Sequence, residues 1–166
     1  MFNTSLINFD QDTIFKINQK MEKETKVGDS NVQRQIEKIV FDHITIQLGM
    51  QFESGVLNVN DSGFQVDFFN KEEKIYGEIY AGIDSLKPGQ IRKVGMDILK
   101  LLTIEKMIGE QIKKYVAFVD PTIERKFKSS SWYSKSLDIF EIEIITITLT
   151  QDQITLIRDT KKNQYR

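Results

Sequence analysis

The stretch that decides the fold of this chain runs from Phe64 to Leu101 and reads FQVDFFNKEEKIYGEIYAGIDSLKPGQIRKVGMDILKL. It contains two short segments of alternating side chains, a polar turn between them and, after a Lys-Pro-Gly break, a long amphipathic segment. Alternation with a period of two predicts β-strands, and apolar residues at intervals of three and four predict a helix. We therefore expect two adjacent strands followed by a helix that runs to about Ile108.

Each of these two strands carries one carboxylate among apolar or aromatic neighbours. On the first strand, alternation places Asp67 and Phe69 on one face, and Val66 and Phe68 on the other. The second strand carries Glu78. A half-buried acid is costly unless it is paired, hydrogen-bonded or bound to a cation. The two acids on adjacent strands are therefore candidate ligands for a divalent metal ion.

The rest of the chain predicts an α/β fold. KYVAFVD is a near-continuous apolar run, which is typical of a buried parallel strand, and EIEIITITLT is rich in β-branched residues, which predicts another interior strand. Strands that alternate with helices late in the chain favour a central mixed β-sheet flanked by helices, in αβββαβαβα order. We expect an N-terminal arm at residues 1–28 and a single domain at residues 29–166. The predicted elements are a helix from Ser30 that stops at Gly49, strands at 55–60, 64–69 and 74–82, a helix from 88 that ends at Gly109, a strand at 114–120, two helical segments at 122–127 and 131–140, a strand at 141–150 and a helix from 151.

Composition excludes several classes of function. The chain of 166 residues has no cysteine, which excludes disulfides, thiol catalysis and thiolate metal sites. Its single histidine, His43, excludes a histidine-rich zinc site. The net charge is -1, from 23 basic and 24 acidic side chains, so nucleic-acid binding would depend on a local patch such as Lys113 and Lys114.

The sequence also bears on location. The N-terminus MFNTSLINFDQ has neither a basic start nor an apolar segment of the kind found in signal peptides. No apolar run approaches the length that spans a membrane. We therefore expect a cytoplasmic protein that does not enter a membrane.

The element order and the two acids resemble the PD-(D/E)xK nuclease superfamily, which has the restriction-endonuclease-like fold. The resemblance covers about Asn31 to Thr150. It implies that Asp67 and Glu78 bind Mg²⁺ or Mn²⁺, and that Glu37 on the first helix joins the site. The family's lysine, two residues after the second acid, is replaced here by Tyr80.

In some members of this superfamily the lysine has moved to the following helix. That helix carries a polar stripe that contains Gln90, Lys93, Asp97 and Lys100. Lys93 is the first candidate for the displaced lysine because it lies near the start of the helix, and Lys87 in the preceding turn is the second. The resemblance thus implies four catalytic residues, Asp67, Glu78, Lys93 and Glu37.

The function implied by the resemblance is metal-dependent hydrolysis of phosphodiester bonds in DNA by an endonuclease. DNA would be the partner of such a protein, and a homodimer or a protein partner would be needed to cut both strands. The alternative is a catalytically inactive protein on the same fold that acts in binding or as a scaffold, and Tyr80 supports it. A third reading is an unrelated α/β domain that binds a small anionic ligand.

Overall fold

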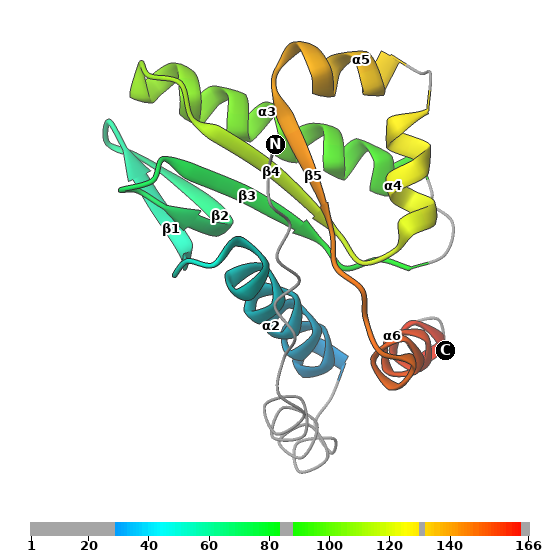
Figure 1. The fold of residues 1–166 in the computed structure, drawn as a ribbon. Helices are drawn as coiled ribbons and strands as arrows, with labels where there is room; N and C mark the ends of the chain where they lie inside the picture. The colour runs from blue at the N-terminus through cyan, green and yellow to red at the C-terminus, as the bar shows by residue number, and fades with distance from the viewer. Residues whose placement is uncertain (1–28, 84–87, 130–131, 164–166) are drawn as a thin grey trace.

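A computed structural model describes residues 29–83, 88–129 and 132–163 of the chain. The arm expected at residues 1–28 and the candidate Lys87 lie outside the described residues. The chain forms an α/β structure with one mixed sheet flanked by helices, as the sequence predicts (Figure 1). Its elements are α2 (Asp29–Leu48), β1 (Glu53–Val59), β2 (Ser62–Asn70), β3 (Ile75–Tyr80), α3 (Pro88–Ile108), β4 (Lys113–Phe118), α4 (Pro121–Lys128), α5 (Trp132–Ile139), β5 (Ile142–Thr146) and α6 (Gln151–Asn163).

The sheet has five strands in the order β1-β2-β3-β4-β5. The first three form an antiparallel meander, whereas β3, β4 and β5 run parallel to one another. β4 is buried between two parallel neighbours, which confirms the prediction for KYVAFVD. The prediction of an interior strand at 141–150 is wrong in two respects: β5 is last in the strand order, and it ends at Thr146. Ile147 and Leu149 lie beyond the end of β5, but both side chains are buried in the hydrophobic core on the α2 face.

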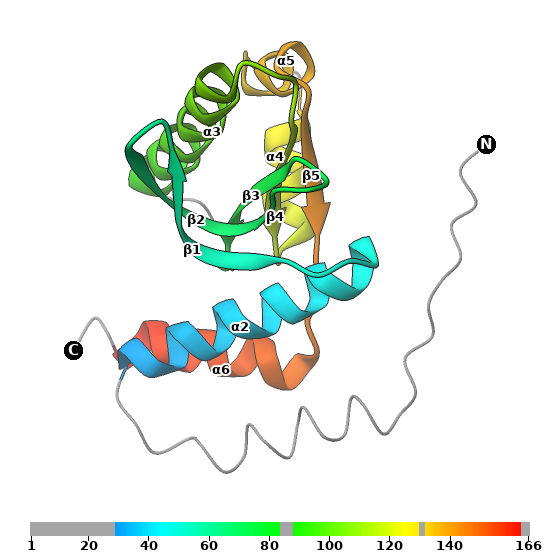
Figure 2. The ribbon, with the colours of Figure 1, turned by 90° about the vertical axis from the view of Figure 1, so that its left-hand side faces the viewer.

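Helices cover both faces of the sheet. α2 and α6 lie side by side on one face, and α3, α4 and α5 lie on the other (Figure 2). Parallel strands require helical crossovers, and these bury the sheet on both sides. The apolar stripe of α2 packs on the first face together with residues from the sheet and from α6, and its buried members are Ile36, Ile39, Val40 and Ile44. On the second face, Leu101 and Ile104 of α3 pack against β1, β2 and β3.

The long helices end where glycine was expected. Gly49 follows α2 with a φ of 66°, and Gly109 follows α3 with a φ of 76°. Both values lie in the left-handed region, which glycine adopts at little cost because it has no Cβ. The Gly109 N–H also donates to the carbonyl of Glu105 at 3.0 Å, which closes the last turn of α3.

β2 contains a bulge at the position of the first candidate acid. Two steps along β1, from Glu53 to Gly55, oppose three steps along β2, from Phe69 to Val66. One extra residue is thus accommodated on β2, and the side-chain alternation is interrupted. Phe68 packs on the α2 face, whereas Val66 and Phe69 both pack on the α3 face. The regular alternation predicted for FQVDFF, with Val66 and Phe68 on the same face, is therefore wrong.

β3 approaches β2 closely just beyond this bulge. Phe68 of β2 is paired with Gly77 of β3, and its ring covers the glycine. A Cβ built on Gly77 would lie 2.0 Å from the Phe68 ring. The glycine therefore lets the aromatic ring fill the core directly over the strand that carries Glu78.

Within the described ranges, none of the helices combines the length and the apolar character needed to cross a lipid bilayer.

Candidate functional site

The two candidate acids lie where β2 and β3 cease to pair. The ladder between these strands ends at Phe68 and Gly77, so Asp67 and Glu78 occupy the next position on each strand. Beyond this point Asp67 Oδ2 accepts a hydrogen bond of 2.8 Å from the backbone N–H of Ile79. A side-chain oxygen thus satisfies a backbone donor that the ladder leaves unpaired. The bulge and this hydrogen bond together hold the Asp67 carboxylate at the fork between the strands.

Glu78 is the most deeply buried acid of this region, with 3% of its surface exposed. Its Oε2 lies 2.8 Å from Nζ of Lys100. Its Oε1 is buried and has no hydrogen-bond partner among the described residues. Burial raises the pKa of Glu78 to about 8, the hydrogen bond from Lys100 opposes this shift, and the charge of Asp67 adds to it. Glu78 therefore changes its charge near neutral pH and keeps one oxygen available for a further ligand.

Lys100 ties α3 to both strands of the fork. Besides the contact with Glu78, its Nζ donates to the backbone carbonyl of Gln65 on β2 at 2.8 Å and lies 3.5 Å from Oδ1 of Asp97. Burial lowers the pKa of Lys100, but the hydrogen bond and the charge of Glu78, together with Asp97 and Asp67, raise it above the usual value. The ammonium group is therefore charged and held in place at the fork.

Asp97 and Lys93 lie on the same polar stripe of α3. The pKa of Asp97 is raised above its usual value, chiefly by burial; the charges of Lys100 and Lys93 oppose this shift and that of Asp67 adds to it. Lys93 is exposed and influences Asp97, and the ammonium in contact with Glu78 is that of Lys100, two helical turns further along α3. The sequence contained the stripe, but it did not reveal which turn of the helix lies level with Glu78.

Tyr80 occupies the position where the resemblance implies lysine. It points to the same face of the sheet as Glu78 and is buried against Phe118, with ring centroids 6.0 Å apart in an edge-to-face arrangement. Burial raises the pKa of Tyr80 to about 12, so its phenol stays protonated at physiological pH. Tyr80 is thus part of the apolar core between β3, β4 and α4.

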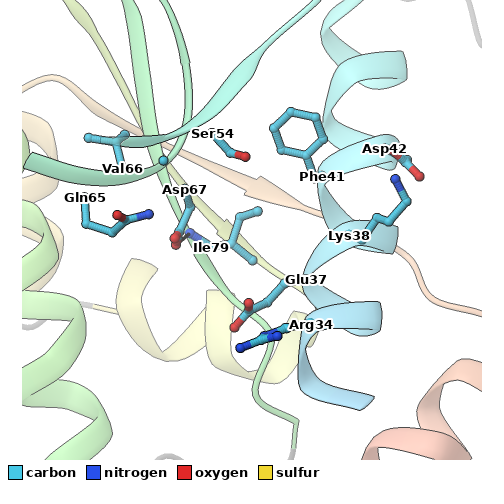
Figure 3. Close-up of a pocket in the computed structure, with 11 residues that line it drawn as sticks. Arg34, Glu37, Lys38, Phe41, Asp42, Ser54, Gln65, Val66, Asp67 and Ile79 are labelled. Atoms are coloured by element: carbon cyan, nitrogen blue, oxygen red, sulfur yellow. Dashed lines mark hydrogen bonds between the residues drawn. The ribbon is translucent and has the colours of Figure 1, made fainter. Parts of the chain in front are cut away.

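A cavity opens beside Asp67 on the α2 side of the sheet. It has a volume of about 430 Å³, a size found in many ligand-binding clefts. Glu37 of α2 and Asp67 of β2 both line it, and Figure 3 shows their carboxylates on opposite sides of the opening. The cavity thus brings together Glu37 and Asp67, two of the predicted acids. Its lining residues are Arg34, Glu37, Lys38, Phe41, Asp42, Ser54, Gly55, Gln65, Val66, Asp67 and Ile79.

The donor set at the fork fits a small hard cation only in part. Asp67 and Glu78 supply two carboxylates that are electrostatically coupled, and the unpaired Oε1 of Glu78 is free to accept a ligand. In residues 29–83, 88–129 and 132–163, no group of three or more acids or histidines is placed to hold a metal ion. Mg²⁺ commonly keeps several waters and binds through one or two carboxylates, so the two acids are sufficient in number.

The basic pair Lys113 and Lys114, named above as an example of a local patch, is divided between the interior and the surface. Lys114 is 2% exposed and pairs with Glu105 of α3, and it also donates to the carbonyl of Ile112 at 3.3 Å. Its charge is therefore used inside the protein, where it links β4 to α3, and cannot contact a phosphate. Only the neighbouring Lys113 is exposed.

The fold and the cluster define an α/β protein with a mixed five-stranded sheet and two acids and a lysine at the fork of two strands. Comparison of the chain with protein-family models, with curated proteins and with solved structures finds no match.

Proposed function

We propose that this protein is a metal-dependent nuclease of the PD-(D/E)xK, restriction-endonuclease-like type, which hydrolyses phosphodiester bonds in DNA. The observation that carries the proposal is the position of Lys100. Its Nζ lies 2.8 Å from Glu78 Oε2, and Asp67 lies at the same fork, where its Oδ2 accepts a hydrogen bond of 2.8 Å from the N–H of Ile79. Two acids on adjacent strands with a lysine beside the second acid are the residue types that this reaction requires.

Lys100 would have the catalytic role of the lysine that the resemblance implies at position 80 on β3. The helix α3 follows β3 in the chain and packs on the same face of the sheet as Glu78, so a lysine on α3 reaches the acid from above the strand. This placement leaves the β3 position free for an apolar role, which Tyr80 fills in the core. Loss of lysine at position 80 is therefore compatible with a complete acid–lysine cluster.

The acids would hold the metal ion and the lysine would support the reaction. Asp67 and Glu78 are the residues that would bind Mg²⁺ or Mn²⁺, which on binding supplies Lewis-acid stabilisation of the phosphate and activation of a water molecule. The Lys100 ammonium stabilises negative charge on hydroxide and on the attacked phosphate, because it is fixed by Gln65 and Asp97 before the substrate arrives. Glu37 faces Asp67 across the cavity and would orient solvent or a second ligand there.

A non-catalytic role in binding or as a scaffold is the second candidate, and one observation favours it. Lys100 already compensates Glu78, and Asp67 already accepts a hydrogen bond from Ile79. The cluster is therefore largely satisfied without a metal ion. The two candidates differ in a single respect that can be measured, which is cleavage.

The experiment compares the full-length protein with its Asp67→Ala, Glu78→Gln and Lys100→Met variants on supercoiled plasmid DNA and on linear duplex, with Mg²⁺ or Mn²⁺. We expect metal-dependent cleavage that each substitution abolishes. Mn²⁺ binding measured by calorimetry should be lost with the two acid variants and retained with Lys100→Met.

Cleavage that survives Glu78→Gln would overturn the proposed site. Binding of metal without cleavage of either DNA would instead favour the scaffold role. If the protein acts as a pair of copies, cleavage of both strands should rise more steeply than linearly with protein concentration.

A further inference from the structure

We propose that Arg34 and Lys38 of α2 bind phosphates of the nucleic-acid strand that is cut, so that the strand runs along α2 over the cavity beside Asp67. This inference rests on the proposed function, because it identifies the substrate contacts of the same site. It assigns a binding role to two cations that neither composition nor the resemblance singled out.

The core sets the direction in which these cations point. One stripe of α2 is buried against the sheet and α6 and includes Ile36, Val40 and Ile44. Since Arg34 and Lys38 lie at other angles on the helix, packing of that stripe leaves both side chains outside the core, and both line the cavity. Figure 3 shows Arg34 and Lys38 on the α2 wall, on either side of Glu37 along the helix.

The charges of the cavity require cations for an anionic ligand. Three acids line the opening, Glu37, Asp42 and Asp67, and each would repel a phosphate. Arg34 and Lys38 stand on the same helix face and are exposed to solvent, so a strand can reach them without displacing core residues. A nucleic-acid backbone that approaches the acids over this cavity would pass both cations, which would offset part of the repulsion.

The spacing of the two cations suits a chain of phosphates. They are one helical turn apart, about 6 Å along the axis of α2. Arginine offers a planar fork that can bind two phosphate oxygens at once, and lysine offers a mobile point charge. Two contacts of this kind hold a strand in register with the acids without reading its sequence.

The test measures how binding of DNA depends on salt. Each phosphate contact made by a cation contributes about 0.9 to the slope of log affinity against log salt concentration for duplex DNA and about 0.7 for single strands. We would use full-length protein without added divalent metal, so that no cleavage occurs, and follow the fluorescence anisotropy of a labelled duplex and of a labelled single strand between about 50 and 200 mM salt.

The variant is Arg34→Gln/Lys38→Gln, and its matched control is Lys106→Gln/Lys135→Gln. Both remove two exposed cations, but Lys106 and Lys135 belong to α3 and α5 on the other face of the sheet. We expect the magnitude of the slope to fall by about 1.8 for duplex or about 1.4 for single strand in the first variant, and by less than about 0.5 in the control. The probe whose slope falls by the full amount expected for its two contacts identifies the form of the strand that lies on α2.

Equal slopes in the wild-type protein and in Arg34→Gln/Lys38→Gln would overturn the inference, and so would an equal change in the control. Absence of salt-dependent binding to either probe would overturn it as well. The cleavage assay is read separately. Cleavage with unchanged slopes would leave the nuclease proposal standing without these contacts, whereas changed slopes without cleavage would place a nucleic-acid strand on α2 of a non-catalytic protein.

Discussion

Lys100 Nζ and Glu78 Oε2 are 2.8 Å apart, although Glu78 belongs to a central strand and Lys100 to the helix that packs above it. The contact is possible because Leu101 and Ile104 anchor α3 on the sheet and so turn the preceding lysine toward the strand. Glu78 carries a buried, unpaired Oε1 beside this contact. The pair is therefore the centre of the candidate site, and the first three predictions concern it.

Lys100→Met should abolish most of the cleavage activity and leave Mn²⁺ binding in place. The substitution keeps the length and the apolar part of the side chain but removes the charge that would stabilise the transition state. Loss of one such preorganised group reduces kcat by about 10²–10³. Single-turnover cleavage of plasmid DNA measures this loss. Lys93→Met is the matched comparison on the same stripe and should retain activity; the reverse result would make Lys93 the catalytic lysine.

Binding of Mn²⁺ should strengthen as the pH rises toward about 8 and then level off. Burial raises the pKa of Glu78 to about 8, so below that pH a proton competes with the metal ion for the carboxylate. One competing proton changes the apparent affinity by about tenfold per pH unit. Calorimetry in two buffers with different ionisation enthalpies counts the protons released. An affinity that does not change between pH 6 and pH 8, within about twofold, would remove Glu78 from the set of ligands.

Glu78→Gln should change how the free energy of unfolding depends on pH. The pKa of Glu78 is about 8 in the folded chain, compared with 4.5 as the reference value for the unfolded chain. Between these two values the folded state holds a proton that the unfolded state has lost. The wild-type protein should therefore lose stability as the pH rises through this window, with a slope of up to about 1.4 kcal/mol per pH unit from this one group.

Urea unfolding at several pH values tests the effect. The Glu78→Gln variant, which cannot ionise at this position, should show a flatter profile and be the more stable protein at pH 9. Parallel profiles for the two proteins between pH 5 and pH 8 would show that Glu78 does not titrate in this range.

Gly77→Ala should destabilise the protein, because the new methyl group meets the ring of Phe68. The built Cβ lies 2.0 Å from that ring, so either the ring or the strand has to move. Overpacking of a core by one methyl group costs about 1–3 kcal/mol. Gly95→Ala is the control, because a Cβ there meets nothing within 4 Å and the residue lies inside α3. The control should be stabilised by about 0.5–1 kcal/mol through helix propensity. Equal melting temperatures for the two variants would contradict this account.

Patterns of apolar residues predicted most of the helices and strands, and they predicted that the strands form one mixed sheet. Strict helical periodicity set α2 and α3, with Gly49 and Gly109 at their ends, and the apolar run KYVAFVD indicated a parallel buried strand. These features depend on which side of a single segment is apolar. The order of residues within that segment is therefore enough to predict them. The edge position of β5 was not predicted, because β-branched residues favour any strand whose faces are covered.

The sequence by itself determined which residue types were available: two acids on neighbouring strands, a polar stripe on the following helix and an acid on the first helix. Only the tertiary structure decided which of them meet. It decided that Lys100 rather than Lys93 contacts Glu78, and that a bulge in β2 places Asp67 at the fork. The physical reason is that local periodicity fixes the face on which a side chain lies, whereas the level at which a helix crosses a strand depends on packing between residues distant in the chain.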